Sequence, residues 1–264
     1  LLLYSGAIHL AGSIKSRKAA RHTVSDWMKL EQERGISVTS SVLQFDYQGR
    51  ACNLLDTPGH ADFSEDTYRT LAAVDSAIML IDHAKGVESR TLKLFEVCRL
   101  RQLPIITFIN KLDREGLDPL QLIDEVSSTL DLQVVPMNWP IGMGKDFRGV
   151  VDVKTREVSL YQAEQKGAAV LETKTMPLDQ ARELIGERLY EKVSEDLELL
   201  EIAGDEYTDE AFLAGETSPV FWGSAMTNFG VDSLLDFVGK NASPPRGREA
   251  DGGEMLEPTS EQFS

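Results

Sequence analysis

The sequence predicts an α/β fold: a mainly parallel sheet covered by helices on both faces, with an inserted α+β subdomain. The first observation is a set of short, almost continuous apolar runs of strand length. The second is that stretches of helical length separate most of these runs. Apolar strands that alternate with amphipathic helices are typical of parallel sheets buried on both faces. The strand-length runs lie at 42–47, 51–55, 77–81, 105–109 and 220–222, and the helical stretches at 62–72, 88–101, 119–130 and 231–240.

The first two runs are connected without a helix. Gln48, Gly49 and Arg50 stand between them, and a short polar segment with a glycine predicts a tight hairpin turn.

The alternation of strands and helices breaks between about 138 and 216, which predicts an inserted subdomain. A strand-like stretch at 149–161 precedes an acidic helix expected over 178–203. Apolar residues recur there at steps of three and four, so one face is expected to pack inward. Carboxylates four residues apart form either a solvated face or a docking surface. The inward set is Leu178, Ala181, Ile185, Leu189, Val193, Leu197 and Leu200, and the carboxylates are Asp179, Glu183, Glu187, Glu191 and Glu195.

Length and composition narrow the class of protein. With 264 residues, 42% of them hydrophobic, the chain can bury a full core. A formal net charge of −16 excludes a general basic surface for nucleic acid, so any contact with RNA is expected to be local. Cys52 and Cys98 stand in apolar runs and are expected to be buried, reduced thiols of a cytoplasmic protein. No apolar run approaches the roughly 18 to 20 residues that cross a bilayer.

The pentapeptide Asp56-Thr57-Pro58-Gly59-His60 directly follows the run at 51–55. This places it at the carboxyl end of a strand, where open α/β sheets bind ligands. A carboxylate there can hold Mg²⁺ through water, and a glycine lets its amide approach a terminal phosphate. The following histidine can orient an attacking water. Taken alone, the pentapeptide is also compatible with a turn that ends a strand.

Asn110-Lys111-Leu112-Asp113 follows the run at 105–109 and is again expected at a carboxyl end. An aspartate can accept hydrogen bonds from the ring N–H and the amino group of guanine, which adenine cannot offer. Ser224-Ala225 follows the last run, and its backbone amides are expected to bind the O6 atom of the same base. Each motif alone also fits an ordinary turn, and their order along the chain carries the prediction.

A polar segment at 34–39 precedes the first strand and contains Gly35, Ile36, Ser37 and Thr39. A hydroxyl in this segment can complete a Mg²⁺ shell, and Ser37 is preferred over Thr39 for that role. Such a loop is expected to order with a nucleoside triphosphate and relax after hydrolysis. The local sequence is also compatible with an irregular loop that enters a strand.

Taken in order, these motifs resemble the G domain of translational GTPases. Within that group, the sequences in and around the motifs are similar to the peptide chain release factor 3 family. The similar segments are 25–28, 33–39, 53–60, 62–71, 139–142 and 228–232. The resemblance implies a P-loop-NTPase-like G domain that binds GTP or GDP with Mg²⁺. It implies that Asp56 and Ser37 hold the metal, Gly59 senses the γ-phosphate and His60 positions water. Asn110, Lys111 and Asp113 would then select guanine.

The resemblance also implies a biological role and a domain plan. The role is GTP hydrolysis on the ribosome, with ribosomal RNA and the stalk protein as contacts, coupled to recycling of stop-codon-reading release factors. A monomer is expected separately, because the sequence shows no obvious apolar interface. The plan is a G domain at 1–137 and 217–241, an inserted subdomain at 138–216, and a linker at 242–264 toward β-barrel domains. An elongation-factor-G-like or ribosomal-protection GTPase, and a non-catalytic ribosome-binding module, are the alternative functions.

A Gly-rich phosphate loop does not occur in this sequence, although the family carries one before the counterpart of Leu1. Gly142-Met143-Gly144-Lys145 superficially resembles that loop, but Asp146 follows the lysine in place of a hydroxyl, so a turn is expected. The chain is therefore expected to be a partial G domain. It is predicted to be inactive as a fragment and to act as a ribosome-stimulated GTPase in the complete protein.

Overall fold

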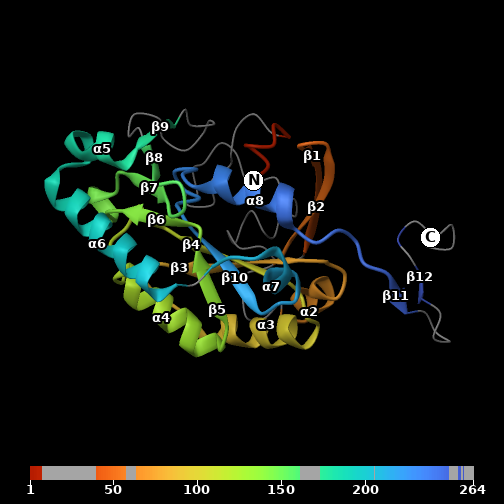
Figure 1. The fold of residues 1–264 in the computed structure, drawn as a ribbon. Helices are drawn as coiled ribbons and strands as arrows, with labels where there is room; N and C mark the ends of the chain where they lie inside the picture. The colour runs from red at the N-terminus through yellow and green to blue at the C-terminus, as the bar shows by residue number, and fades with distance from the viewer. Residues whose placement is uncertain are drawn as a thin grey trace, which may run out of the picture.

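The computed structural model describes residues 1–7, 40–57, 64–160, 173–204, 206–249, 255–256 and 258. Its centre is a four-stranded sheet in the order β3-β4-β10-β5 (Figure 1). All three strand pairs are parallel, which confirms the predicted parallel sheet. The strands are β3 (Ala77–Asp82), β4 (Ile105–Asn110), β10 (Thr217–Trp222) and β5 (Gln133–Pro136). Strand β5 was not predicted, because its four residues are too few to display a period.

Helices cover both faces of this sheet, as the apolar strands predict. Alternate residues of β4 point to opposite sides: Ile105 and Ile109 belong to one apolar cluster, whereas Ile106 and Phe108 belong to another. The first cluster includes side chains of α3 (Ser89–Leu100) and α4 (Pro119–Leu130), and the second includes side chains of α7 (Asp209–Leu213) and α8 (Val231–Asn241). In Figure 1, α3 and α4 accordingly lie on one side of the sheet and α8 lies on the other. Helix α2 (Ser64–Leu71) precedes β3.

The ends of α4 follow from its sequence. Asp118 caps the helix by accepting hydrogen bonds from the amides of Leu120, at 3.0 Å, and Gln121, at 3.3 Å. Pro119 occupies the first turn, where the missing N–H costs nothing. These residues fix the start of α4 close to the loop that follows β4.

Strands β1 (Ser41–Tyr47) and β2 (Arg50–Asp56) form the predicted hairpin, with Gln48 and Gly49 at the turn. The expectation that β2 lies buried within the parallel sheet is wrong for the described residues: β2 pairs with β1 in a two-stranded sheet of its own. Ala51 and Asn53 are exposed and alternate with half-buried neighbours. This alternation is typical of an antiparallel ribbon with one solvated face.

The tip of the hairpin is attached to α8. The hydroxyl of Tyr47 donates a 2.5 Å hydrogen bond to Oδ1 of Asp236, and Nε2 of Gln48 donates to the same oxygen at 2.8 Å. Gly239 gives the tyrosine ring room, because a Cβ there would lie 2.9 Å from Cδ1 of Tyr47. Burial, followed by the bond to Asp236, raises the pKa of Tyr47 to about 12, so this donor keeps its proton at neutral pH.

A second sheet is antiparallel, in the order β6-β7-β8-β9. Its strands are β6 (Asn138–Ile141), β7 (Gly149–Asp152), β8 (Glu157–Leu160) and β9 (Lys174–Pro177). The single strand-like stretch expected at 149–161 is thus two strands, because the chain turns between them and Arg156 takes a left-handed φ of 59°. A short 3-10 helix, η2 (Gly144–Asp146), connects β6 to β7. The turn predicted at 142–145 agrees with this connection.

The acidic helix expected over 178–203 is two helices, α5 (Leu178–Ile185) and α6 (Glu187–Ala203). The break lies at Gly186, whose φ of 85° and ψ of 150° are accessible to glycine and strained for other residues. The inward face is as predicted: six of its seven residues are buried, and Leu200 packs against the same core. The outer carboxylates do not form one continuous ladder, since Glu187 begins α6 and pairs with Arg182 of α5.

The second sheet shares an apolar core with the first. The rings of Trp139 and Trp222 meet edge to face with centroids 5.5 Å apart, and Nε1 of Trp139 donates a 3.1 Å hydrogen bond to Asp196 of α6. Residues of both sheets therefore form one continuous cluster. The bounds 138–216 for an inserted subdomain remain a prediction.

The segment after α8 lies against the main sheet's amino end. The amide of Ser243 donates to Oγ of Ser76 at 3.1 Å, and the amide of Arg246 donates to Oδ1 of Asp75 at 3.3 Å. The guanidinium of Arg246 also donates to the carbonyl oxygen of Leu213 at 3.2 Å. Two short strands, β11 (Arg248–Glu249) and β12 (Met255–Leu256), follow. Part of the predicted linker is thus held in place. Among the described residues, no helix has the length and apolar composition to span a membrane.

Candidate nucleotide-binding site

The loops that follow β4 and β10 are joined at the carboxyl edge of the main sheet. The amide of Gly223 donates to the carbonyl oxygen of Ile109 at 3.0 Å, and the amide of Leu112 donates to that of Gly223 at 3.2 Å. Leu112 is fully buried and anchors the first loop in the core. The two motifs that the sequence placed at strand ends therefore form one surface.

Side chains reinforce this junction. The hydroxyl of Ser224 donates to Oδ1 of Asp113 at 2.6 Å, and the amide of Ala225 donates to Oδ1 of Asn110 at 2.9 Å. The amide of Lys111 donates to the same Asn110 oxygen at 2.8 Å. Asn110 therefore holds the two loops together, while Ser224 orients the carboxylate of Asp113.

The backbone amides of Ser224 and Ala225 donate to protein acceptors in this structure. The amide of Ser224 donates to the carbonyl oxygen of Phe229 at 2.9 Å, and that of Ala225 donates to Asn110. Both amides predicted to bind a guanine O6 atom thus have protein acceptors. The reason is local: Ser224 and Phe229 exchange both backbone bonds and close a narrow loop before α8.

Gly223 is required by close packing at this loop. A Cβ at this position would lie 2.4 Å from the carbonyl oxygen of Phe229 and 2.8 Å from Cζ of Phe108. Both distances are far below ordinary contact, so a larger residue would push the β10 loop away from β4.

Asp82, the last residue of β3, also reaches this surface. Its carboxylate pairs with the amine of Lys111, and its Oδ1 accepts a 2.9 Å hydrogen bond from the amide of Ala84. Burial is the largest single effect on Asp82 and opposes ionisation, but the bonds from Lys111 and Ala84 together outweigh it and lower its pKa. Asp82 was not among the predicted site residues, although it directly follows an apolar run, as Asp56 does.

His83 and Gly144 pack beside the loop that follows β4 and support it from behind. His83 is fully buried, and its Nε2 donates to the carbonyl oxygen of Leu117 at 2.9 Å. Burial lowers its pKa, which keeps the ring neutral and a donor at one nitrogen. The amide of Gly144, from the glycine-containing turn, donates to the carbonyl oxygen of Leu112 at 2.9 Å. That turn therefore supports the loop after β4.

Of the residues predicted to bind phosphate and metal, the structure describes Asp56 and Thr57. Asp56 is half-buried at the end of β2, and Thr57 follows it. Because β2 pairs only with β1 in the part of the chain that the structure describes, Asp56 and Asn110 end strands of different sheets. The predicted residues Gly35, Ile36, Ser37, Thr39, Pro58, Gly59 and His60 lie outside the described residues. The described ranges contain no group of three or more His, Cys, Asp or Glu residues suited to a metal ion.

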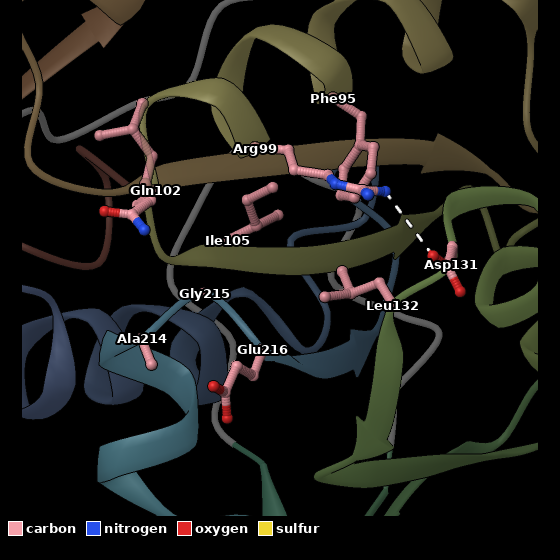
Figure 2. A pocket seen from close by; sticks show the side chains of 10 residues that line it. Phe95, Arg99, Gln102, Ile105, Asp131, Leu132, Ala214, Gly215 and Glu216 are labelled. Atoms are coloured by element: carbon pink, nitrogen blue, oxygen red, sulfur yellow. Dashed lines mark ion pairs between the residues drawn. The ribbon is translucent and has the colours of Figure 1, made fainter.

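A cavity of about 310 Å³ lies away from this surface, at the amino end of the sheet (Figure 2). Ile105 and Leu132 line it, and the ion pair of Arg99 and Asp131, at 3.7 Å, lies at one side. Ile105 begins β4 whereas Asn110 ends it, so roughly 16 Å of strand separates this cavity from the loops at the carboxyl edge. Open α/β sheets bind ligands at the opposite edge, and the loops after β4 and β10 are accordingly the candidate site.

Comparison with known proteins also indicates a nucleotide-binding domain. Residues 1–244 match the elongation factor Tu GTP-binding domain family. The chain is 52% identical to peptide chain release factor 3 of Symbiobacterium thermophilum over the whole of its length, which corresponds to 50% of that protein. It thus spans about half the length of this curated relative. A crystal structure of a Thermus thermophilus protein shares the fold, with a TM-score of 0.72 and 24% identity over 93% of this chain and 37% of the other. The chain belongs to the elongation factor Tu GTP-binding domain family.

Proposed function

We propose that the complete protein binds and hydrolyses GTP on the ribosome and promotes the recycling of stop-codon-reading release factors. The observation that carries the proposal is the 52% identity to peptide chain release factor 3 over the whole length of the chain. The protein would act as a monomer in the cytoplasm. It would contact ribosomal RNA, the ribosomal stalk protein and the release factors.

The joined loops at the carboxyl edge support guanine as the base. Asp113 is partly exposed, and Ser224 holds one of its oxygens. A carboxylate fixed in this way can accept hydrogen bonds from two adjacent N–H groups of a base. Guanine offers such a pair and adenine does not, so the loop discriminates by leaving its acceptor unpaired with the wrong base.

The phosphate side of the proposal depends on residues of two other loops. Asp56 and Ser37 offer carboxylate and hydroxyl oxygens, which fit the preference of Mg²⁺ for hard oxygen ligands. When bound, the metal would neutralise charge on the β- and γ-phosphates. Gly59 would contribute its amide to the γ-phosphate, Ser37 and Thr39 would order with it, and His60 would orient the attacking water.

The test uses the complete protein and its His60→Ala variant. We expect slow intrinsic GTP hydrolysis that ribosomes accelerate, and faster dissociation of a stop-codon-reading release factor from termination complexes when GTP is added. The His60→Ala variant should keep GDP binding and lose the stimulated hydrolysis. Stimulation of translocation instead would favour an elongation-factor-G-like activity, and ribosome binding without nucleotide binding would favour a non-catalytic module.

A further inference from the structure

The loop that recognises the base contains a lysine with an unusual conformation. Lys111 has a φ of 77°, in the left-handed region that residues other than glycine seldom occupy. The residues on both sides fix it: Leu112 is fully buried, and Oδ1 of Asn110 accepts the amide of Lys111 at 2.8 Å. The backbone therefore directs this long side chain along the edge of the sheet.

The lysine amine is held by a residue of the adjacent strand. In the parallel register of β3 and β4, Asp82 is the direct partner of Asn110, so the carboxylate lies beside the first residue of the recognition loop. Its Oδ2 accepts the amine of Lys111, while its Oδ1 accepts the amide of Ala84 at 2.9 Å. Only 13% of the Asp82 side chain is exposed, against 40% for Lys111. The carboxylate is thus fixed at both oxygens and partly shielded from water, whereas the lysine faces the surface.

We propose that Asp82 is a positioning residue for guanine-nucleotide binding, which acts by holding the amine of Lys111 at the edge where the nucleotide lies. This inference rests on the proposed function and adds a residue from a third strand to it. Without Asp82, the amine is free to turn toward the carboxylate of Asp113 in the same loop, which is the group needed by the base. Asp82 therefore keeps Lys111 extended and leaves Asp113 available.

A double-mutant cycle tests the dependence on Lys111. The affinity for GDP is measured by titration of the complete protein and of its Asp82→Asn, Lys111→Met and double variants. We expect Asp82→Asn to raise the Kd for GDP about tenfold, the order of one charge-assisted hydrogen bond. In the Lys111→Met background, the same substitution should change the Kd by less than about twofold, because the lysine through which it acts is gone.

A matched control separates this role from general effects of charge or stability. Asp131 is 90% exposed at the opposite end of the sheet, and Asp131→Asn should leave the Kd for GDP unchanged. Thermal unfolding verifies that each variant is folded, and Asp82→Ser repeats the cycle with a smaller polar side chain if Asp82→Asn does not fold.

Three results would overturn the inference. If the unsubstituted protein does not bind GDP, both the proposed function and this inference are wrong. If it binds GDP but Asp82→Asn binds equally well, only the role of Asp82 is wrong. An additive loss in the double variant would assign Asp82 a structural effect that is independent of Lys111.

Discussion

The hydroxyl of Ser224 donates a 2.6 Å hydrogen bond to Oδ1 of Asp113, although the two residues are 111 positions apart. The bond connects the loop after β10 to the loop after β4, at the edge where parallel strands present ligand-binding residues. It orients a carboxylate whose second oxygen lies 3.9 Å from Nε of Arg114. This arrangement joins the two loops in one surface.

Replacement of Asp113 by asparagine should change the base that is bound. An amide offers one acceptor and one donor group where the carboxylate offers acceptors only, so it no longer matches the two N–H groups of guanine. We expect the affinity for GDP to fall on the order of a hundredfold or more, and xanthosine diphosphate to bind better than GDP. Competition between the two nucleotides measures this preference. Asp131→Asn serves as the control, and an unchanged preference in Asp113→Asn would contradict the assignment of the loop.

Removal of the Ser224 hydroxyl should weaken the same contact indirectly. Asp113 would lose the donor that orients it, and we expect Ser224→Ala to raise the Kd for GDP about tenfold. Isothermal titration calorimetry measures the loss. Ser128 is a suitable control, because its hydroxyl donates to Asp124 on the exposed side of α4, so Ser128→Ala should bind as the unsubstituted protein does. Equal affinity of both variants would show that Ser224 does not orient Asp113.

The sequence was sufficient to predict those parts of the fold that depend on local patterns. The strands β3, β4 and β10, the hairpin turn at Gln48 and Gly49, and the inward face of α5 and α6 are confirmed. Each has a period or turn signal within one segment. The break at Gly186 was missed because the apolar period continues across it, and a glycine inside a helical pattern does not by itself end a helix.

The pairing of strands was harder to predict than the strands themselves. The hydrophobic run at 51–55 resembles a buried strand, but its partner is the adjacent β1, and burial in a hairpin depends on which neighbours cover each face. The meeting of the loops after β4 and β10 at one edge was predicted through Asn110, Asp113 and Ser224. The pairing of Asp82 with Lys111 was not, since it follows from the β3–β4 register, which no single segment encodes.

The side chain of Asn138 should contribute strongly to stability. Its Oδ1 accepts the amide of Trp222 at 2.7 Å and its Nδ2 donates to the carbonyl oxygen of the same residue at 3.3 Å, both in the core. Asn138→Ala would leave two buried backbone groups without these partners, and we expect the free energy of unfolding to fall by about 2–4 kcal/mol.

Urea denaturation provides the measurement for this variant. Asn241 makes an exposed hydrogen bond to Asp209 at 2.8 Å, so Asn241→Ala should cost less than about 1 kcal/mol. A loss in Asn138→Ala no larger than in Asn241→Ala would contradict the assigned role.

The two cysteines should differ in reactivity. The expectation that both are buried holds for Cys98 alone, since Cys52 is only half-buried on the hairpin. Burial raises the pKa of Cys98 to about 11, so at pH 8, three units lower, about one thiol in a thousand is ionised. Iodoacetamide at pH 8 should therefore modify Cys52 and spare Cys98 until the protein is denatured. Peptide mass spectrometry identifies the modified residue, and labelling of Cys98 in native Cys52→Ser would refute its protection.

The contacts of Ser243 and Arg246 determine the path along which the chain leaves α8. Pro- and Gly-containing segments ordinarily sample many directions, but here the carboxylate of Asp75 and the hydroxyl of Ser76 hold the backbone at two points. Both residues belong to the short connection between α2 and β3. A shift of that connection would therefore move the backbone at Ser243 and Arg246 with it, so the direction in which the chain leaves α8 depends on the loop between α2 and β3.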